Sequence, residues 1–235
     1  MKIVLVTLLS LATGAIAAEP DFAALREELV EEVRLFAGYV GDEPFSDAVL
    51  DVLNTVERHK FVPPGEVRYA YENRPLAIGH GQTISQPYIV ALMTDLIAPE
   101  PDDVVLEVGT GSGYQAAVLS ALVDQVYSIE IIEALAQEAA ARLERLGYDN
   151  ISTKLGDGYH GWQEHAPFDA IVVTAAASHV PPPLIEQLKP GGRMVIPVGG
   201  RFVTQLLLLL EKNEDGEIIT RQIGAVRFVP LTGEH

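Results

Sequence analysis

Apolar residues recur at helical spacing in the first part of the chain that follows residue 21. From 22 to 37, residues such as Leu29 and Val33 recur at steps of three and four, with acidic residues between them, which is typical of an amphipathic helix. A second stretch, 45–56, keeps this period and is followed by the helix-breaking run Pro63-Pro64-Gly65. The pattern predicts two N-terminal helices ahead of the main sheet.

From residue 103 onward, short apolar runs bounded by turn residues alternate with helical stretches. Such alternation predicts parallel βαβ units with right-handed crossovers, and therefore an α/β fold. Near the end of the chain, two strand-like runs are joined by Asn213-Glu214-Asp215-Gly216, which predicts an antiparallel hairpin. The expected strands are 104–108, 126–129, 151–155, 170–174, 193–198, 205–211 and 217–229, and the expected helices between them are 115–123, 132–146 and 183–188.

The first residues of the chain differ from the rest. A basic start at Lys2 precedes an apolar run from Ile3 to Ile16, and Ala15-Ile16-Ala17 forms a small-x-small cleavage pattern. We interpret residues 1–18 as a secretory signal peptide, so the mature protein, 19–235, is expected to be exported to the periplasm without stable membrane association. The alternatives are an uncleaved anchor, for which the run is short of the roughly 20 residues that a bilayer requires, and an ordinary N-terminal segment of a cytoplasmic protein.

Charge and composition exclude several classes of protein. The 33 acidic residues outnumber the 16 basic ones and give a net charge of -17. Such a surface repels phosphate backbones, so nucleic acid is not an expected partner. The chain has no cysteine, which excludes disulfides and thiolate metal sites. Its histidines lack the spacing of metal ligands, so we expect no metal.

The strongest local motif is the strand 104–108 running directly into a loop with Gly109, Gly111 and Gly113, which opens a helix. Glycines let backbone amides approach a ligand closely at the carboxyl edge of a parallel sheet. The dinucleotide fingerprint requires glycine or alanine where Tyr114 stands, which disfavours NAD. The three glycines are therefore candidate contacts to another cofactor.

Acidic residues accompany the ends of three successive expected strands. Glu107 lies in the first, where its carboxylate could meet the positive end of a zwitterionic ligand such as a methionine moiety. Glu130 ends the second and could accept both hydroxyls of a ribose. Asp157, followed by Gly158, comes after the third and could accept a hydrogen bond from the exocyclic amine of adenine. Each acid fits a different part of one nucleoside-like ligand.

The segment 74–87 is rich in glycine, hydroxyl and amide groups and precedes an expected helix that runs to about Ile97. Two interpretations remain open from the residues alone. Backbone amides of the segment, with the hydroxyls of Thr83 and Ser85, could hold an anion at the N-terminus of that helix. Alternatively, the segment is only a capping loop, with Ser85 as the N-cap and Pro87 in the first turn.

Three segments together resemble the protein-L-isoaspartate O-methyltransferase family. They are 72–87, which includes Gln82-Thr83-Ile84-Ser85-Gln86-Pro87, the loop 107–114 and the tail 226–232. The resemblance spans about 22–234 and implies a Rossmann-like class I methyltransferase sheet of about seven strands, mostly parallel with a C-terminal antiparallel hairpin. This sheet would occupy 99–235, behind N-terminal helices and a substrate loop in 19–98.

The resemblance also implies a function. The donor is S-adenosyl-L-methionine, and the acceptor is the carboxyl group of isoaspartyl residues in damaged proteins and peptides, so the enzyme serves protein repair. The active-site serine of the family falls on Ser85. The residues implied in donor binding are Thr83, Glu107, Gly109, Gly111, Gly113, Glu130, Asp157, Gly158 and Thr232.

Two other functions remain as alternatives. One is an S-adenosylmethionine-dependent methyltransferase with another acceptor, which would keep the glycine loop and the acids. The other is an exported, non-catalytic binding module, because little S-adenosylmethionine is expected outside the cytoplasm. The usual members of the family are cytosolic and lack a signal-like N-terminus such as residues 1–18.

Overall fold

The computed structural model describes residues 20–40, 44–200 and 204–233. The expected signal peptide, 1–18, lies outside these ranges. The two predicted N-terminal helices are present and are followed by two short 3₁₀ turns. These elements are α1 (Phe22–Val40), α2 (Asp47–Thr55), η1 (Arg58–Phe61) and η2 (Pro64–Tyr69).

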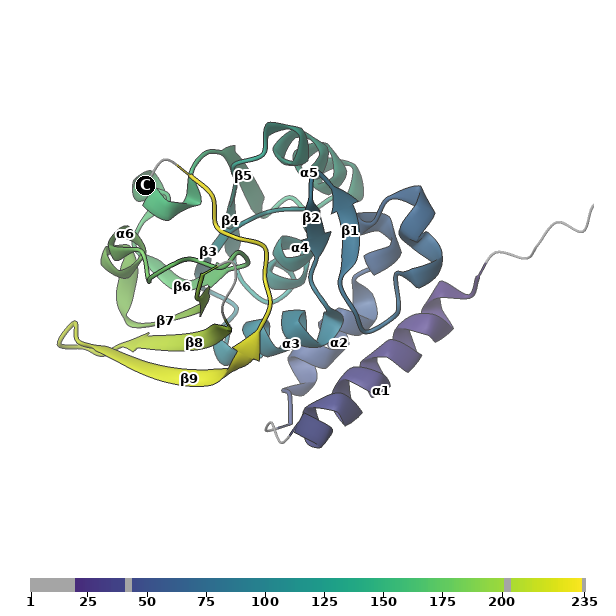
Figure 1. The fold of residues 1–235 in the computed structure, drawn as a ribbon, viewed down its shortest axis with the longest axis horizontal. Helices are drawn as coiled ribbons and strands as arrows, with labels where there is room; N and C mark the ends of the chain where they lie inside the picture. Colours follow the sequence, from purple (N-terminus) through teal and green to yellow (C-terminus); the bar gives the residue numbers. More distant parts are fainter. Residues whose placement is uncertain (1–19, 41–43, 201–203, 234–235) are drawn as a thin grey trace, which may run out of the picture.

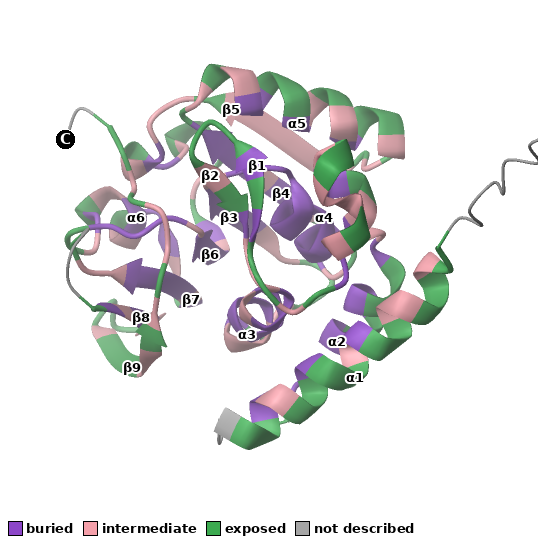
Figure 2. Cartoon of the chain, turned by 45° about the vertical axis from the view of Figure 1, so that its right-hand side comes forward, coloured by how far each residue is buried: buried purple, intermediate pink, exposed green. Residues whose placement is uncertain are grey.

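Helix α1 lies along the side of the molecule, against α2 and against α3 (Pro87–Leu96) (Figure 1). It buries Leu29, Val33 and Ala37 in this contact, and its outer side is exposed (Figure 2). The helix is therefore amphipathic, as its spacing predicted. Within the described ranges, none of the helices combines the length and the apolar character needed to cross a membrane.

A short antiparallel hairpin precedes α3, where the sequence predicted only a loop. Its strands are β1 (Leu76–Gly79) and β2 (Gln82–Ile84). Gly79, His80 and Gly81, at the turn, all have positive φ. Glycine adopts this left-handed region readily, so the residues that suggested a loop in fact build a tight turn.

Among the described residues, the main sheet has the strand order β5-β4-β3-β6-β7-β8-β9 (Figure 1). Neighbouring strands from β5 to β7 pair in parallel, and β8 pairs antiparallel with both β7 and β9. The structure thus confirms the predicted α/β fold with its C-terminal hairpin. The elements are β3 (Val104–Val108), α4 (Tyr114–Ser120), β4 (Gln125–Glu130), α5 (Glu133–Leu146), β5 (Ile151–Leu155), η3 (Gly158–His160), η4 (Gln163–His165), β6 (Phe168–Val173), α6 (Pro182–Glu186), β7 (Leu188–Val198), β8 (Gln205–Lys212) and β9 (Ile218–Val226).

The start of β7 differs from its prediction. The sequence suggested a helix to residue 188 and a strand from 193, but α6 ends at Glu186 and β7 begins at Leu188. Leu188 pairs with Phe168 of β6, and a register irregularity follows before the regular pairing resumes. The earlier start of β7 was not predicted because proline and glycine, here Pro190-Gly191, normally indicate a turn.

Both faces of the sheet are covered, which explains the nearly continuous apolar runs of its strands. Helices α4 and α5 pack against β4 and β5, while α6 packs against β7 and η3. Successive residues of one strand enter different cores: Val105 belongs to the larger core with α2 to α5, and Leu106 to the core around α6. Figure 2 shows the central strands β3 and β6 and helix α4 buried, whereas the edge strands β5 and β9 are not. The arrangement leaves the carboxyl ends of the strands open to hold a site.

Candidate active site

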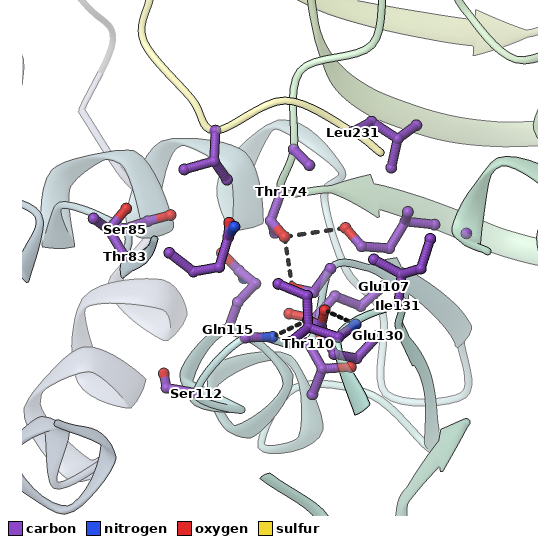
Figure 3. Close-up of a pocket in the computed structure, with 18 of the residues that line it drawn as sticks. Thr83, Ser85, Glu107, Thr110, Ser112, Gln115, Glu130, Ile131, Thr174 and Leu231 are labelled. Carbon is purple, nitrogen blue, oxygen red and sulfur yellow. Dashed lines mark hydrogen bonds between the residues drawn. The ribbon is translucent and has the colours of Figure 1, made fainter. Parts of the chain in front are cut away.

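The end of β3 lies where the order of strands along the chain reverses, with β4 on one side and β6 on the other. At such a switch point the connections diverge and leave a crevice, in which open α/β sheets bind ligands. A pocket opens at this place (Figure 3). It brings together most of the residues predicted for the site, namely Thr83, Ser85, Glu107, Gly109, Gly111, Glu130, Gly158 and Thr232.

The glycines of the loop after β3 are required by its backbone. Gly109, Gly111 and Gly113 all have positive φ, a region that other residues adopt only with strain. At Gly109, a Cβ atom would lie 2.4 Å from Oγ1 of Thr174, which hydrogen-bonds to the Gly109 carbonyl at 2.6 Å. Gly113 is the N-cap of α4 and packs near Leu143, so it shapes the loop without lining the pocket.

Glu130 fixes this loop and faces the pocket at the same time. Its Oε2 accepts a hydrogen bond from the amide of Gly111 at 2.8 Å, and its Oε1 accepts one from the amide of Ile132 at 2.9 Å. A carboxylate has about four acceptor positions, so both oxygens can still accept from a ligand. The side chain is buried yet lines the pocket, an arrangement that suits the two hydroxyls of a ribose.

Glu107 is fully buried at the floor of the pocket. The hydroxyl of Ser128 hydrogen-bonds to Oε2, and within the described structure Oε1 has no hydrogen-bond partner. Burial raises the pKa of Glu107 to about 8, because an ionised carboxylate loses its hydration there. A cationic group of a ligand placed beside Oε1 would offset this cost, as the sequence predicted for a zwitterionic ligand.

Asp157 lies beside the pocket but outside its lining. Its side chain caps η3 by accepting a hydrogen bond from the amide of Tyr159 at 2.9 Å. The next residue, Gly158, does line the pocket, and a Cβ atom there would lie 2.3 Å from Val108. The structure therefore places this segment at the site, and the contact of Asp157 with adenine stays a prediction.

Ser85 stands opposite the acids, on the other side of the pocket (Figure 3). The N-cap of α3 is Gln86, with Pro87 at the first position of the helix, so the alternative that Ser85 is the helix cap is wrong. Among the described residues, its hydroxyl makes no hydrogen bond, while its carbonyl accepts one from Arg58 at 2.7 Å. The hydroxyl is therefore available to a ligand.

The tail after β9 forms part of the pocket wall. It is held by hydrogen bonds from the Ala176 amide to the Val229 carbonyl and from the Leu231 amide to the Ala176 carbonyl, each 2.8 Å long. These contacts bring Thr232 into the pocket wall. On the opposite side, Thr83 of β2 also lines the pocket and is exposed.

Several residues that line or support the pocket were not predicted from the sequence. Thr174 directly follows β6 and supports the glycine loop, and Ile131 directly follows Glu130 and is partly exposed in the pocket. Both stand at strand ends, so the rule that located the acids could have located them as well. Ser128 gave no such signal, because it lies inside β4 and reaches Glu107 only across the sheet.

A family model and the sequence relatives indicate one family. The family model described as Protein-L-isoaspartate(D-aspartate) O-methyltransferase matches residues 27–235. A protein-L-isoaspartate O-methyltransferase 2 of Syntrophobacter fumaroxidans is 59% identical over 98% of this chain and 96% of its own length. A protein-L-isoaspartate O-methyltransferase 1 of Cupriavidus necator is 60% identical over 97% of this chain and 89% of its own length.

Solved structures agree with the sequences. A protein-L-isoaspartate O-methyltransferase structure superposes with a TM-score of 0.79 at 29% identity, covering 88% of this chain and 66% of the other. A structure from Plasmodium falciparum, described as a β-aspartate methyltransferase in complex with S-adenosyl-L-homocysteine, gives a TM-score of 0.73 at 26% identity and covers 88% and 98%. The chain therefore belongs to the protein-L-isoaspartate(D-aspartate) O-methyltransferase family of S-adenosylmethionine-dependent enzymes.

Proposed function

We propose that this chain transfers a methyl group from S-adenosyl-L-methionine to the carboxyl group of isoaspartyl residues, and that the transfer takes place beside Ser85. One observation carries the placement: the pocket with the acids and a second, wider groove share Thr83, Ser85, Thr174 and the tail residues Val229 and Pro230. We call the pocket with the acids the donor pocket and the wider one the acceptor groove. A donor in the donor pocket and a polypeptide in the acceptor groove would meet at these shared residues.

The residues present fit the donor. Glu130 offers two partly used carboxylate oxygens for hydroxyl groups, and the buried Oε1 of Glu107 suits the ammonium of a methionine moiety. Ile131 offers an apolar surface next to Glu130. When bound, the donor would supply a methyl group on a positively charged sulfur: a carboxylate oxygen of the acceptor would bond to the methyl carbon as the S–CH3 bond breaks, giving a methyl ester and neutral S-adenosyl-L-homocysteine.

The reaction needs alignment more than proton transfer. A carboxylate is already a nucleophile, so the site requires no strong base, and the Ser85 hydroxyl can orient the acceptor by donating a hydrogen bond to one of its oxygens. The negative carboxylate and the positive sulfur neutralise each other as the bond forms. A site that excludes water and holds no lysine or arginine therefore favours the transition state over the separated charges. The pocket with the acids has no basic residue in its described lining.

The acceptor groove suits a polypeptide. It has a cavity of about 1180 Å³ lined by α3, β8, β9 and the segment that follows β9, together with Phe36 of α1. Apolar side chains such as Tyr88 and Leu92 form its wall, and its described lining contains Arg227 but no acidic residue. A protein of net charge -17 thus keeps carboxylates away from the place where a carboxylate must bind.

One assay separates this function from its alternatives. Purified protein is incubated with donor labelled in the methyl group and with an isoaspartyl peptide, beside the aspartyl peptide of the same sequence. We expect rapid labelling of the isoaspartyl peptide alone. Equal labelling of both peptides would indicate another acceptor, and donor binding without any transfer would indicate a non-catalytic binding module.

We also propose that the protein is exported and that isoaspartyl residues of extracytoplasmic proteins are its substrates. The proposal rests on the order of Lys2, the apolar run 3–16 and the pattern Ala15-Ile16-Ala17. N-terminal sequencing of the protein recovered from fractionated native cells tests it. A chain that begins near Ala18 or Glu19 in the periplasmic fraction is the expected result, and an intact Met1 on a cytoplasmic product contradicts it.

A further inference from the structure

Arg58, the first residue of η1, is an arginine without a carboxylate. Its side chain is fully buried, and within the described structure it forms no ion pair; its Nε and Nη1 have no hydrogen-bond partner. Its Nη2 donates a hydrogen bond to the carbonyl of Ser85 at 2.7 Å, and its guanidinium carbon lies 4.8 Å from the centre of the Tyr114 ring. Burial lowers the pKa of Arg58 to about 10, so the group is still charged at neutral pH.

Stability does not explain this residue. Transfer of a guanidinium from water into the protein interior is costly, and two nitrogen atoms here recover no hydrogen bond. An apolar side chain of similar length, such as methionine, would fill the same space without that cost. The charge makes two interactions, a hydrogen bond to the backbone of Ser85 and a contact with the ring of Tyr114, so the function of Arg58 lies in what it holds together.

Arg58 contacts one residue on the acceptor side of the site, Ser85, and one on the donor side, Tyr114. Ser85 joins β2 to the N-cap of α3 and stands where the two pockets meet. Tyr114 is the first residue of α4, directly after the glycine loop, and it lines the donor pocket. Arg58 itself lines neither pocket. It therefore acts from behind the site, on the relative position of the acceptor side and the donor side.

We propose that Arg58 is a positioning residue for methyl transfer, which fixes the Ser85 turn against α4 so that the acceptor is held in line with the donor. The inference rests on the proposed function. An electrostatic role in binding the acceptor carboxylate is a poorer explanation, because a cation facing that carboxylate would stabilise the reactants more than a transition state in which their charges disappear. A positioning role acts on turnover instead of binding.

The test compares Arg58→Met and Arg58→Lys with the matched control Arg26→Met. Arg26 makes the same kind of hydrogen bond, from Nε to the carbonyl of Asn54 at 2.9 Å, but on the N-terminal helices. In Arg58→Met we expect kcat on the isoaspartyl peptide to fall roughly 10- to 150-fold, the effect of losing one hydrogen bond from a charged group. The peptide KM and the donor Kd should change less than about 3-fold. Lysine keeps the charge and one donor, so Arg58→Lys should recover part of kcat.

Hydrogen exchange supplies a readout that does not depend on activity. Amides in the segment 82–92 should exchange faster in Arg58→Met than in wild type or Arg26→Met, because the Ser85 turn has lost its anchor. Unchanged exchange in this segment, or an unchanged kcat in Arg58→Met, would overturn the inference, as would an equal loss of kcat in Arg26→Met. If wild type fails to methylate the isoaspartyl peptide, the proposed function fails and the role in turnover fails with it, while the exchange of 82–92 separately shows whether Arg58 anchors the Ser85 turn.

Discussion

Glu130 contributes both to the ligand site and to the conformation of the glycine loop, and the sequence suggested only the first of these roles. Its position at the end of β4 predicted a contact with the ligand, and the structure adds two hydrogen bonds to the amides of Gly111 and Ile132. Glu130→Ala should therefore lose ligand contacts and loosen the glycine loop together. Since each hydrogen bond to a charged group is worth about 1.5–3 kcal/mol, donor affinity should fall by roughly 10- to 150-fold or more. Calorimetry measures this, and an unchanged Kd would remove Glu130 from the donor site.

Ser85 should affect turnover and leave donor binding alone. Its hydroxyl makes no hydrogen bond within the described structure and is not the cap of α3, so its removal should not disturb the helix. We expect Ser85→Ala to lower kcat roughly 10- to 150-fold, the effect of one lost hydrogen bond to a charged acceptor. Ser85→Thr keeps a hydroxyl and serves as the control. A donor Kd that changes as much as kcat would indicate that the Ser85 hydroxyl contacts the donor and not only the acceptor.

Glu107 should release a proton when the donor binds. Burial raises the pKa of this carboxyl to about 8 from its ordinary value of 4.5, so at pH 7 most molecules hold it protonated. An ammonium group beside Oε1 favours the ionised form and lowers that pKa again. Calorimetric titration at pH 7 in phosphate and in Tris should give different enthalpies, consistent with release of up to about one proton. The difference should shrink in Glu107→Gln; the same difference in this variant would assign the proton to another group.

The raised pKa of Glu107 also makes the stability of the folded protein depend on pH. A carboxyl whose pKa is raised in the folded state contributes most to stability below its unfolded pKa, near 4.5, and that contribution is lost as the pH rises towards about 8. Glu107→Gln does not titrate. Without donor, its melting temperature relative to wild type should therefore rise over this window, and a parallel dependence of both proteins on pH would contradict the shift.

Residues at strand ends were predictable, and residues that act through contacts remote in sequence were not. Parallel strands bring their carboxyl ends to one edge, so Glu107, Glu130 and the segment at Gly158 could be assigned to one site from their order alone. Arg58 lies 27 positions before Ser85, and Ser128 lies 21 positions after Glu107. No periodicity links such pairs, so only the folded structure brings them together.

Among the helices and strands, too, some could be predicted from the sequence and others could not. Long helices and buried strands could be predicted because many of their side chains follow one hydrophobic pattern, as in helices α1 and α5. The hairpin of β1 and β2 was missed because strands of three or four residues carry too few positions to show an alternation. The start of β7 was missed because Pro190 and Gly191 indicate a turn locally, while pairing with β6 keeps the backbone extended.

The glycine loop and the end of β6 form one packed unit, which a double-mutant cycle can test. Gly109→Ala places a methyl group 2.4 Å from Oγ1 of Thr174 and forces φ near +100° on a residue with a Cβ atom. Left-handed strain of about 1–2 kcal/mol and overpacking of about 1–3 kcal/mol should both reduce the free energy of unfolding. In a Thr174→Ala background only the strain remains. Urea unfolding of the four proteins measures the coupling, and strictly additive effects would show that the two residues do not touch in solution.

At the scale of the whole molecule, a net charge of -17 acts on every acceptor that approaches. The groove beside Ser85 has Arg227 and no acidic residue in its described lining, but the rest of the surface creates a negative field around it. An isoaspartyl peptide with acidic neighbours should be repelled at low salt and one with lysine neighbours attracted. Salt at about 0.15 M limits this field to about 8 Å.

The prediction is therefore a change of opposite sign for two peptides that differ only in their flanking charges. Between about 10 mM and 150 mM salt, where the screening length falls from about 30 Å to about 8 Å, kcat/KM should rise several-fold for the acidic peptide and fall several-fold for the basic one. A peptide with neutral flanks is the control for effects of salt on the enzyme itself. The kcat values should stay close together, because steering acts on the encounter and not on the aligned complex. Equal salt slopes for the acidic and basic peptides would show that the local surface of the groove, with Arg227, governs the encounter instead of the total charge.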